Sequence, residues 1–169
     1  MLEQKTYQFG YLEGTVDDLT PEQRADYGAA MAGRNQAYAP YSHYHVGAFL
    51  RMNDGTTAHG WNAETIAYDG VHAEESARAR ITKMARESGL KRAVIVGASE
   101  GDSEDCNTTA PCGGCRQKLL EYTKVGDNPE VIMASVSGKV KIAGLRDMLS
   151  FAFFPDSISP VTEKGKVAK

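Results

Sequence analysis

Small and apolar side chains recur every three or four positions between residues 72 and 88, which is the spacing of one face of a helix. Gly89 is expected to end this helix. A second helix is predicted over residues 21–39, because Thr-Pro-Glu-Gln at positions 20–23 supplies an N-cap, a proline in the first turn and a capping glutamine. A third helix begins near Pro111 and also has an apolar side.

Short apolar runs separate these helices and predict strands. Residues 46–50 and 56–61 flank an Asn-Asp-Gly turn at positions 53–55, a pattern typical of a hairpin. Residues 93–96 and 131–134 are continuous apolar runs of the kind that is buried on both faces of a sheet. Because helices alternate with buried strands, the sequence predicts a three-layer α/β domain.

Length and composition agree with one folded domain. The chain has 169 residues, of which 41% are hydrophobic and 24% charged, and it contains no internal repeat or linker that would divide it. We therefore expect a single domain over residues 1–169, with residues 1–19 as an N-terminal extension and residues 160–169 as a flexible tail.

Charge and hydropathy narrow the range of partners. The 19 Lys and Arg against 22 Asp and Glu give a net charge of -3, whereas binding to a nucleic-acid polyanion needs clustered cations. No apolar run approaches the roughly 20 residues of a membrane span. The N-terminus also lacks the basic start and apolar stretch of an export signal. These features predict a cytoplasmic protein that binds a small molecule and neither nucleic acid nor membrane.

Candidate metal ligands stand at the starts of two predicted helices. His72 opens one of them within His-Ala-Glu, and Cys112 and Cys115 open the other within Pro-Cys-Gly-Gly-Cys. Zn²⁺ binds imidazole and thiolate, and a catalytic zinc site has three protein ligands with a further position open to water. Helix N-termini also favour thiolate over thiol. The three side chains therefore predict a catalytic zinc site.

Glu74 follows His72 by two residues, so its carboxylate can lie beside the metal without binding it. Zinc lowers the pKa of a bound water to about 7. A neighbouring carboxylate can take a proton from that water and deliver it to a substrate, which is general acid–base catalysis. Glu74 is therefore the predicted catalytic residue.

The residues alone also allow other interpretations of the two cysteines. A Cys-x-x-Cys pair also occurs in structural zinc sites and in redox pairs. A closed structural site would need a fourth ligand from Cys106 or from one of His43, His45 and His59. We expect His43 and His45 to be surface or hydrogen-bonded histidines, and Cys106 to be a thiol in the polar loop of residues 99–110.

Several motifs in one order resemble the free-nucleoside cytidine deaminases. His-x-Glu followed by Pro-Cys-x-x-Cys is the signature of zinc-dependent base deaminases. The resemblance runs from about residue 21 to 158 and is carried by four segments: Pro40-Tyr41-Ser42-x-Tyr44-x-Val46-Gly47-Ala48, Gly60-x-Asn62-x-Glu64, His72-Ala73-Glu74 and Pro111-Cys112-Gly113-x-Cys115-Arg116-Gln117.

This resemblance implies an α/β/α fold with a mixed central sheet of about five strands. It implies pyrimidine salvage by hydrolysis of cytidine or deoxycytidine to uridine or deoxyuridine and ammonia. Zinc-bound hydroxide would attack C4 while Glu74 protonates N3 and then assists the departing amine. Because compact members of the family are homotetramers, it also implies a homotetramer with one Zn²⁺ per subunit.

The resemblance also assigns the substrate contacts. Asn62 and Glu64 match the residues that hold the sugar hydroxyls, and Tyr44 matches an aromatic residue that lines the base pocket. Ala73 is placed among the substrate-binding residues as well. An amide and a carboxylate suit a pair of hydroxyl groups, whereas a carboxylate repels the phosphate of a nucleotide.

Three features depart from the family pattern. Glu75 stands where members with three cysteine ligands carry arginine, because a neutral imidazole leaves no excess negative charge to balance. The connection between Asn62 and His72 is slightly shorter than in compact members, which leaves the choice of cytosine nucleoside open. Ser150 replaces the proline of the family's Leu-Leu-Pro-x-x-Phe stretch, whose phenylalanine, here Phe153, reaches the active site of a neighbouring subunit.

Two side chains outside the ligand set are expected to support the site. We expect the Arg116 guanidinium to donate to a cysteine sulfur or to a nearby carbonyl, so that Arg116→Ala lowers activity more than zinc content. The three phenylalanines between residues 151 and 154 are expected to lie in the core or in an interface, since burying one contributes about 1.5–3 kcal/mol.

Two further functions stay open on this sequence. An aminohydrolase of a modified cytosine nucleoside such as blasticidin S would share the metal chemistry and differ at the rim of the pocket. A non-catalytic, zinc-stabilised binding module would keep the ligands and have no use for Glu74. A deaminase of RNA or DNA would need a basic groove, against which the net charge and Glu64 argue.

Overall fold

The fold is built on one six-stranded sheet. The computed structural model describes residues 2–101 and 107–154, and the strands within them follow the order β1-β6-β5-β4-β2-β3. Among these strands only β4 and β5 pair in parallel, so the sheet is mixed, as the resemblance implied, with six strands where about five were expected. The strands are β1 (Leu12–Thr15), β2 (Tyr44–Met52), β3 (Thr57–Trp61), β4 (Leu90–Ser99), β5 (Glu130–Ala134) and β6 (Lys139–Gly144).

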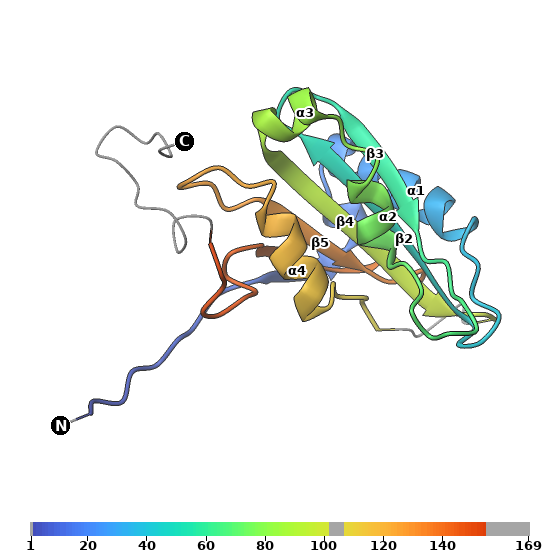
Figure 1. Cartoon of the computed structure of the whole chain (residues 1–169), viewed down its shortest axis with the longest axis horizontal. Helices are drawn as coiled ribbons and strands as arrows, with labels where there is room; N and C mark the ends of the chain where they lie inside the picture. The colour runs from blue at the N-terminus through green and yellow to red at the C-terminus, as the bar shows by residue number, and fades with distance from the viewer. Residues whose placement is uncertain (1, 102–106, 155–169) are drawn as a thin grey trace.

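Helices cover both faces of this sheet, and the predicted three-layer architecture is confirmed. One face packs against α1, and the opposite face, toward the viewer in Figure 1, packs against α2, α3 and α4. A short 3-10 helix, η1, follows β1. The helices are η1 (Val16–Asp18), α1 (Pro21–Arg34), α2 (Ala73–Arg78), α3 (Lys83–Ser88) and α4 (Gly113–Leu120).

Strand β4 supplies both hydrophobic cores. Ala93 and Ile95 belong to the cluster beneath α2, α3 and α4, whereas Val94 and Val96 belong to the cluster beneath α1. This division follows from the geometry of a strand, in which successive side chains point to opposite faces. All four residues are fully buried, which confirms the prediction from their continuous apolar run.

Two glycines allow helices to lie directly on the strands. A Cβ on Gly47 of β2 would come within 2.0 Å of the carbonyl oxygen of Ala30 in α1. A Cβ on Gly60 of β3 would come within 2.1 Å of the carbonyl oxygen of Ala73 and 2.3 Å of the backbone nitrogen of Ala77, both in α2. Any side chain at residue 60 would therefore separate α2 from the sheet.

The helix predicted over residues 72–88 is divided in two. α2 ends at Arg78, and α3 begins after Thr82, whose hydroxyl accepts a hydrogen bond of 3.3 Å from the backbone N–H of Ala85. Threonine is a good N-cap, and the β-branched pair at residues 81 and 82 is stiff within a helix. Gly89, with φ of 88°, ends α3 as predicted.

α1 is shorter than predicted, because Tyr38 pairs with the chain that follows β3. The backbone N–H of Tyr38 donates to the carbonyl of Asn62 at 3.0 Å, and the N–H of Glu64 donates to the carbonyl of Tyr38 at 2.8 Å. These bonds end the helical region at Arg34 and place residues 62–64 beside the end of α1.

The N-terminal part of the chain contributes a strand to the sheet. Strand β1, which falls within the stretch expected as an N-terminal extension, pairs with β6 at one edge of the sheet. The residues before β1 run away from the body of the molecule in Figure 1. The expected tail, residues 160–169, lies outside the described residues. None of the helices formed by the described residues is long and apolar enough to cross a membrane.

Candidate active site

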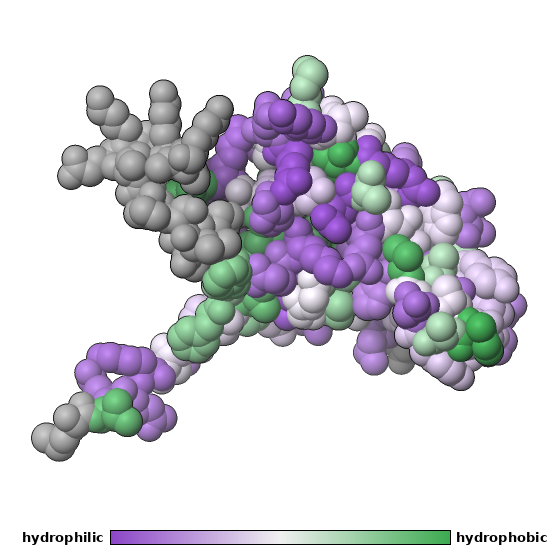
Figure 2. Space-filling view, viewed as in Figure 1, coloured by the Kyte–Doolittle hydropathy of each residue, from purple (hydrophilic) through white to green (hydrophobic). Residues whose placement is uncertain are grey.

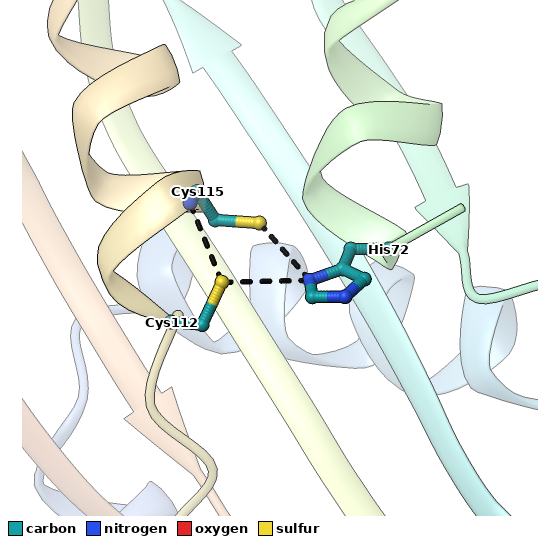
Figure 3. A group of neighbouring side chains, drawn as sticks. All are labelled: His72, Cys112 and Cys115. Carbon is teal, nitrogen blue, oxygen red and sulfur yellow. Dashed lines mark hydrogen bonds between the residues drawn. The ribbon is translucent and has the colours of Figure 1, made fainter. Parts of the chain in front are cut away.

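The starts of α2 and α4 bring an imidazole and two sulfur atoms together. His72 is the N-cap of α2, and Cys112 is the N-cap of α4. Nδ1 of His72 lies 3.5 Å from Sγ of Cys112 and 3.4 Å from Sγ of Cys115. Figure 3 shows the ring directed at the two sulfurs, which approach it from the neighbouring helix.

These separations fit a tetrahedral zinc ion. With Zn–S bonds of about 2.3 Å and Zn–N bonds of about 2.0 Å, tetrahedral angles place a nitrogen and a sulfur ligand about 3.5 Å apart. The ligand atoms of His72, Cys112 and Cys115 all lie within 4.8 Å of one another, and they form the one such cluster found among residues 2–101 and 107–154. A fourth position therefore stays free of protein ligands from this part of the chain.

The other candidate ligands lie elsewhere or outside the described residues. His43 pairs with Glu100, with 3.4 Å between Nδ1 and a carboxylate oxygen, and His59 packs its ring against Phe49. Neither joins the metal cluster, and the same holds for His45. Cys106, the expected loop thiol, lies outside the described residues.

The environment of the sulfurs favours a bound cation. Burial, reinforced by the negative charge of Glu74, raises the pKa of the Cys115 thiol well above its ordinary value. A buried thiol of this kind becomes a thiolate when a metal ion supplies positive charge beside it. Cys112, in contrast to Cys115, is exposed, and its Sγ accepts a hydrogen bond of 3.4 Å from the backbone N–H of Cys115 in the first turn of α4.

Glu74 lies in the first turn of α2, beside the metal ligands. Only 5% of the residue is exposed, and it lines the same cavity as His72 and Cys112. Burial raises the pKa of its carboxyl group. A carboxyl group with a raised pKa holds a proton nearer to neutral pH than an exposed glutamate does, which suits general acid–base catalysis.

A cavity of about 600 Å³ opens from Glu74 toward the surface. Its walls come from the segments before and within β2, from the connection between β3 and α2, and from the chain that precedes α4. Of the residues predicted to contact substrate, four line the cavity: Tyr44, Asn62, Glu64 and Ala73.

Asn62 and Glu64 fasten the walls of this cavity to each other. The amide of Asn62 accepts a hydrogen bond of 2.8 Å from the N–H of Val46 and donates one of 2.9 Å to the carbonyl of Tyr44. The carboxylate of Glu64 accepts from the N–H of Tyr41 at 3.0 Å and from the N–H and hydroxyl of Ser42. These bonds, above all that from the Ser42 hydroxyl, lower the pKa of Glu64. The carboxylate is therefore charged at neutral pH.

The Tyr44 ring is held by a partner that the sequence did not reveal. Its hydroxyl lies 2.7 Å from Oγ1 of Thr109, and the Thr109 hydroxyl donates to the carbonyl of Gly97 at 2.9 Å. Since threonine has one hydroxyl proton, the Tyr44 hydroxyl is the donor in this chain of bonds. A Cβ on Gly97 would lie 2.7 Å from Oγ1 of Thr109 and 3.0 Å from the Tyr44 ring, so the glycine leaves room for the pair.

The rim of the cavity is aromatic. The rings of Tyr41 and Tyr68 are in contact, with 6.2 Å between their centroids, and Tyr68 is 85% exposed. Its backbone has φ of 59°, which is unusual for a residue other than glycine. Figure 2 shows apolar side chains at the end of the molecule where the segments after α1 and β3 meet. In the segment after β3, Ile66 is 72% exposed.

Arg116 holds the segment that leads to Cys112 by donating hydrogen bonds to backbone carbonyl groups. Its Nε donates to the carbonyl of Pro111 at 2.8 Å, and its Nη1 donates to the carbonyl of Met148 at 2.7 Å. The expectation that this guanidinium binds a nearby carbonyl is confirmed. The contact ties the residue before Cys112 to the chain that follows β6.

Phe153 lies outside the cavity of its own chain. The residue is 60% exposed, and its backbone N–H and carbonyl pair with the side-chain amide of Gln117 at 3.1 and 2.6 Å. Phe151 is fully exposed, whereas Phe154 packs against the core beneath α4. The described residues of one chain thus partly bury one of the three phenylalanines and leave two at the surface.

Comparison with known proteins agrees with this geometry. A family model described as the zinc-binding region of cytidine and deoxycytidylate deaminases matches residues 23–127, which include both ligand segments. The chain belongs to the cytidine deaminase family. The cytidine deaminase of Sporosarcina psychrophila is 32% identical over 133 residues, which are 78% of this chain and 90% of that protein. The cytidine deaminase of Halalkalibacterium halodurans is 29% identical over 130 residues.

Solved structures of cytidine deaminases share the fold. The crystal structure of the cytidine deaminase from Burkholderia pseudomallei matches with a TM-score of 0.64 and 34% identity, over 80% of this chain and 100% of that one. The enzyme from Mycobacterium leprae matches with a TM-score of 0.59 and 26% identity, over 78% and 99%. The predicted cytidine deaminase fold and its zinc cofactor are therefore confirmed.

Proposed function

We propose that the protein hydrolyses cytidine or deoxycytidine to uridine or deoxyuridine and ammonia. The observation that carries this proposal is a buried carboxylate, Glu74, beside three zinc ligands at the inner end of a cavity. His72, Cys112 and Cys115 would hold Zn²⁺, which would lower the pKa of a water molecule to about 7 and so supply the nucleophile.

Glu74 moves the protons of this reaction. It takes a proton from the attacking water and delivers it to N3 of the cytosine ring, which makes C4 more electrophilic. The carboxylate then takes the proton of the hydroxyl group added at C4 and passes it to the 4-amino group, which leaves as ammonia as the C4–N4 bond breaks and the C4=O bond of uridine forms. Its raised pKa supports this role, because the carboxylate must accept a proton and hold it briefly in each transfer.

The other cavity residues orient the nucleoside. Asn62 and Glu64 contact the sugar hydroxyls, and the charge of Glu64 disfavours a phosphate at the same place. Tyr44 forms the wall beside the base. Ala73 is 1% exposed and has only a methyl side chain, so it contacts the base through its backbone.

A second candidate substrate is a modified cytosine nucleoside such as blasticidin S. The exposed aromatic rim formed by Tyr41 and Tyr68 supports this candidate, because it lies where a larger substituent would leave the cavity. Either substrate would use the same metal and the same proton transfers.

The decisive experiment follows the absorbance of cytidine during incubation with the purified protein, beside deoxycytidine, cytosine, adenosine and blasticidin S. We expect turnover of cytidine or deoxycytidine. Glu74→Gln should lower turnover by at least about 100-fold, because it removes general acid–base catalysis. The variant should keep its zinc, as measured by metal analysis.

Two outcomes would contradict the proposal. Absence of turnover with every compound would exclude a deaminase of these substrates. If the parent protein gives no reaction, and Glu74→Gln binds these compounds as tightly as the parent and keeps its structure, the result would instead support a zinc-stabilised binding module.

We also propose that the active form is a cytoplasmic homotetramer that serves pyrimidine salvage. The exposed rings of Phe151 and Phe153 support the assembly, because neighbouring exposed aromatic side chains are typical of protein interfaces. In the tetramer, Phe153 reaches the cavity of an adjacent subunit.

A further inference from the structure

An ion pair joins the two helices that carry the metal ligands. Nζ of Lys118 in α4 binds Oε1 of Glu75 in α2. Glu75 follows His72 by three residues, and Lys118 follows Cys115 by three residues. Residues three apart lie on one face of a helix. The ion pair therefore links the helices on the same faces that present the ligands, one turn further along.

The carboxylate of Glu75 also binds the backbone of a ligand residue. Its Oε2 accepts a hydrogen bond of 3.2 Å from the N–H of His72. One carboxylate thus holds the residue that supplies the imidazole and, through its other oxygen, the helix that supplies a sulfur. The two halves of the metal site are connected by side chains as well as by the sheet beneath them.

We propose that Glu75 and Lys118 are positioning residues that hold His72 at the distance from Cys112 and Cys115 that zinc binding requires. This inference rests on the proposed zinc-dependent function and deepens it. The pair is partly exposed, with side-chain exposures of 24% for Glu75 and 48% for Lys118. An exposed pair adds little to the overall stability of a protein, so its effect belongs to the local geometry of the site.

Zinc affinity distinguishes this role from a simple effect of charge. If the pair positions the ligands, Glu75→Gln and Lys118→Met both weaken zinc binding, because either change breaks the link. If only charge matters, the two variants act in opposite directions. Loss of the carboxylate then weakens the binding of a cation, and loss of the ammonium group strengthens it.

The test measures the zinc affinity of the full-length protein by competition with a chromophoric chelator. We expect each single variant to bind zinc about tenfold more weakly, as is typical when the support of a ligand is removed. The double variant should be no weaker than the weaker single variant. Lys118→Arg should stay within about twofold of the parent, because arginine can keep the ion pair.

A matched control is the ion pair between Arg86 and Glu121, which links α3 to the end of α4 at 2.7 Å. Glu121→Gln should leave the zinc affinity unchanged. Circular dichroism spectra of the variants at 25 °C should match that of the parent, which separates ligand positioning from a loss of folding.

The inference is overturned if Lys118→Met binds zinc as tightly as the parent or more tightly, or if Glu121→Gln weakens zinc binding as much as Lys118→Met does.

The proposed function is tested separately, by the activity of the parent protein. A parent that binds zinc and deaminates cytidine while all variants keep its zinc affinity contradicts the positioning role alone. A parent that binds zinc without deamination, and whose two single variants lose affinity, contradicts the proposed function alone.

Discussion

At the scale of single residues, the wall of the cavity depends on a hydroxyl group from a distant segment. Tyr44 and Thr109 are 65 positions apart and meet because the chain before α4 passes beside β4, where Gly97 leaves space. Members of the metal cluster could be predicted because short fixed spacings, His-x-Glu and Cys-x-x-Cys, carry the chemistry. Thr109 belongs to no such motif, so no pattern of residues pointed to its contact with Tyr44.

We expect Tyr44→Phe to raise KM for cytidine by about two- to tenfold with a smaller change in kcat. The loss of one hydrogen bond, about 0.5–1.5 kcal/mol, frees the ring that forms the wall beside the base. Steady-state kinetics measure the effect. Tyr38→Phe removes an exposed tyrosine hydroxyl beyond the cavity lining and serves as the control. An unchanged KM in Tyr44→Phe would show that the hydroxyl does not position the ring.

At the scale of elements, α1 is fastened to the sheet by a buried charge network. Asp26 of α1 is 0% exposed and accepts hydrogen bonds from Arg51 of β2 at 3.0 Å and from Arg92 of β4 at 2.7 Å. Arg92 also binds Glu22 and Glu130. The network crosses the face opposite the metal site and fixes the helix against the strands that hold the cavity.

Asp26→Asn should lower the free energy of unfolding by about 3–5 kcal/mol, because it leaves the buried Arg92 and the partly buried Arg51 without their shared carboxylate. Urea denaturation at neutral pH measures the change. The exposed pair of Arg86 and Glu121 provides the contrast, since Glu121→Gln should cost no more than about 1 kcal/mol. Equal effects of the two substitutions would show that burial does not govern the strength of the network.

The strands and helices that the sequence predicted correctly are the ones with a strong apolar pattern. Residues 93–96 and 131–134 fall within β4 and β5, and both are buried on two faces. β1 and β6 were missed, since they lie at one side of the sheet and contain exposed charged residues such as Lys139. The break between α2 and α3 was missed as well, because the apolar periodicity continues across it, whereas α2 ends at Arg78 and Thr82 caps the start of a new helix.

At the scale of the whole molecule, one chain leaves aromatic side chains uncovered beside its C-terminal described segment. Phe151 and Phe153 project from the chain after β6, and Phe153 is fastened through its backbone to Gln117 of α4. The apolar composition of this segment predicted burial, and the sequence could not tell the core from an interface, since both remove the same surface from water.

We expect light scattering to give a mass four times the 18.3 kDa of the chain. Phe153→Ala should lower activity without loss of zinc, since the ring is expected to act in the cavity of a neighbour. Phe151→Ala serves as the comparison for a general loss of apolar surface. A monomeric mass with full activity would exclude any contribution of Phe153 across subunits.

Gly60 connects the architecture of the sheet to the chemistry above it. The absence of one methyl group on β3 sets the height at which α2 rests, and the beginning of α2 carries both the imidazole and the proton-transferring carboxylate. Alanine at this position would act as a wedge beneath α2, lifting His72 and Glu74 together while the sulfurs on α4 stayed in place. Zinc binding and proton transfer would then be lost together, although neither a metal ligand nor the catalytic carboxylate had been replaced.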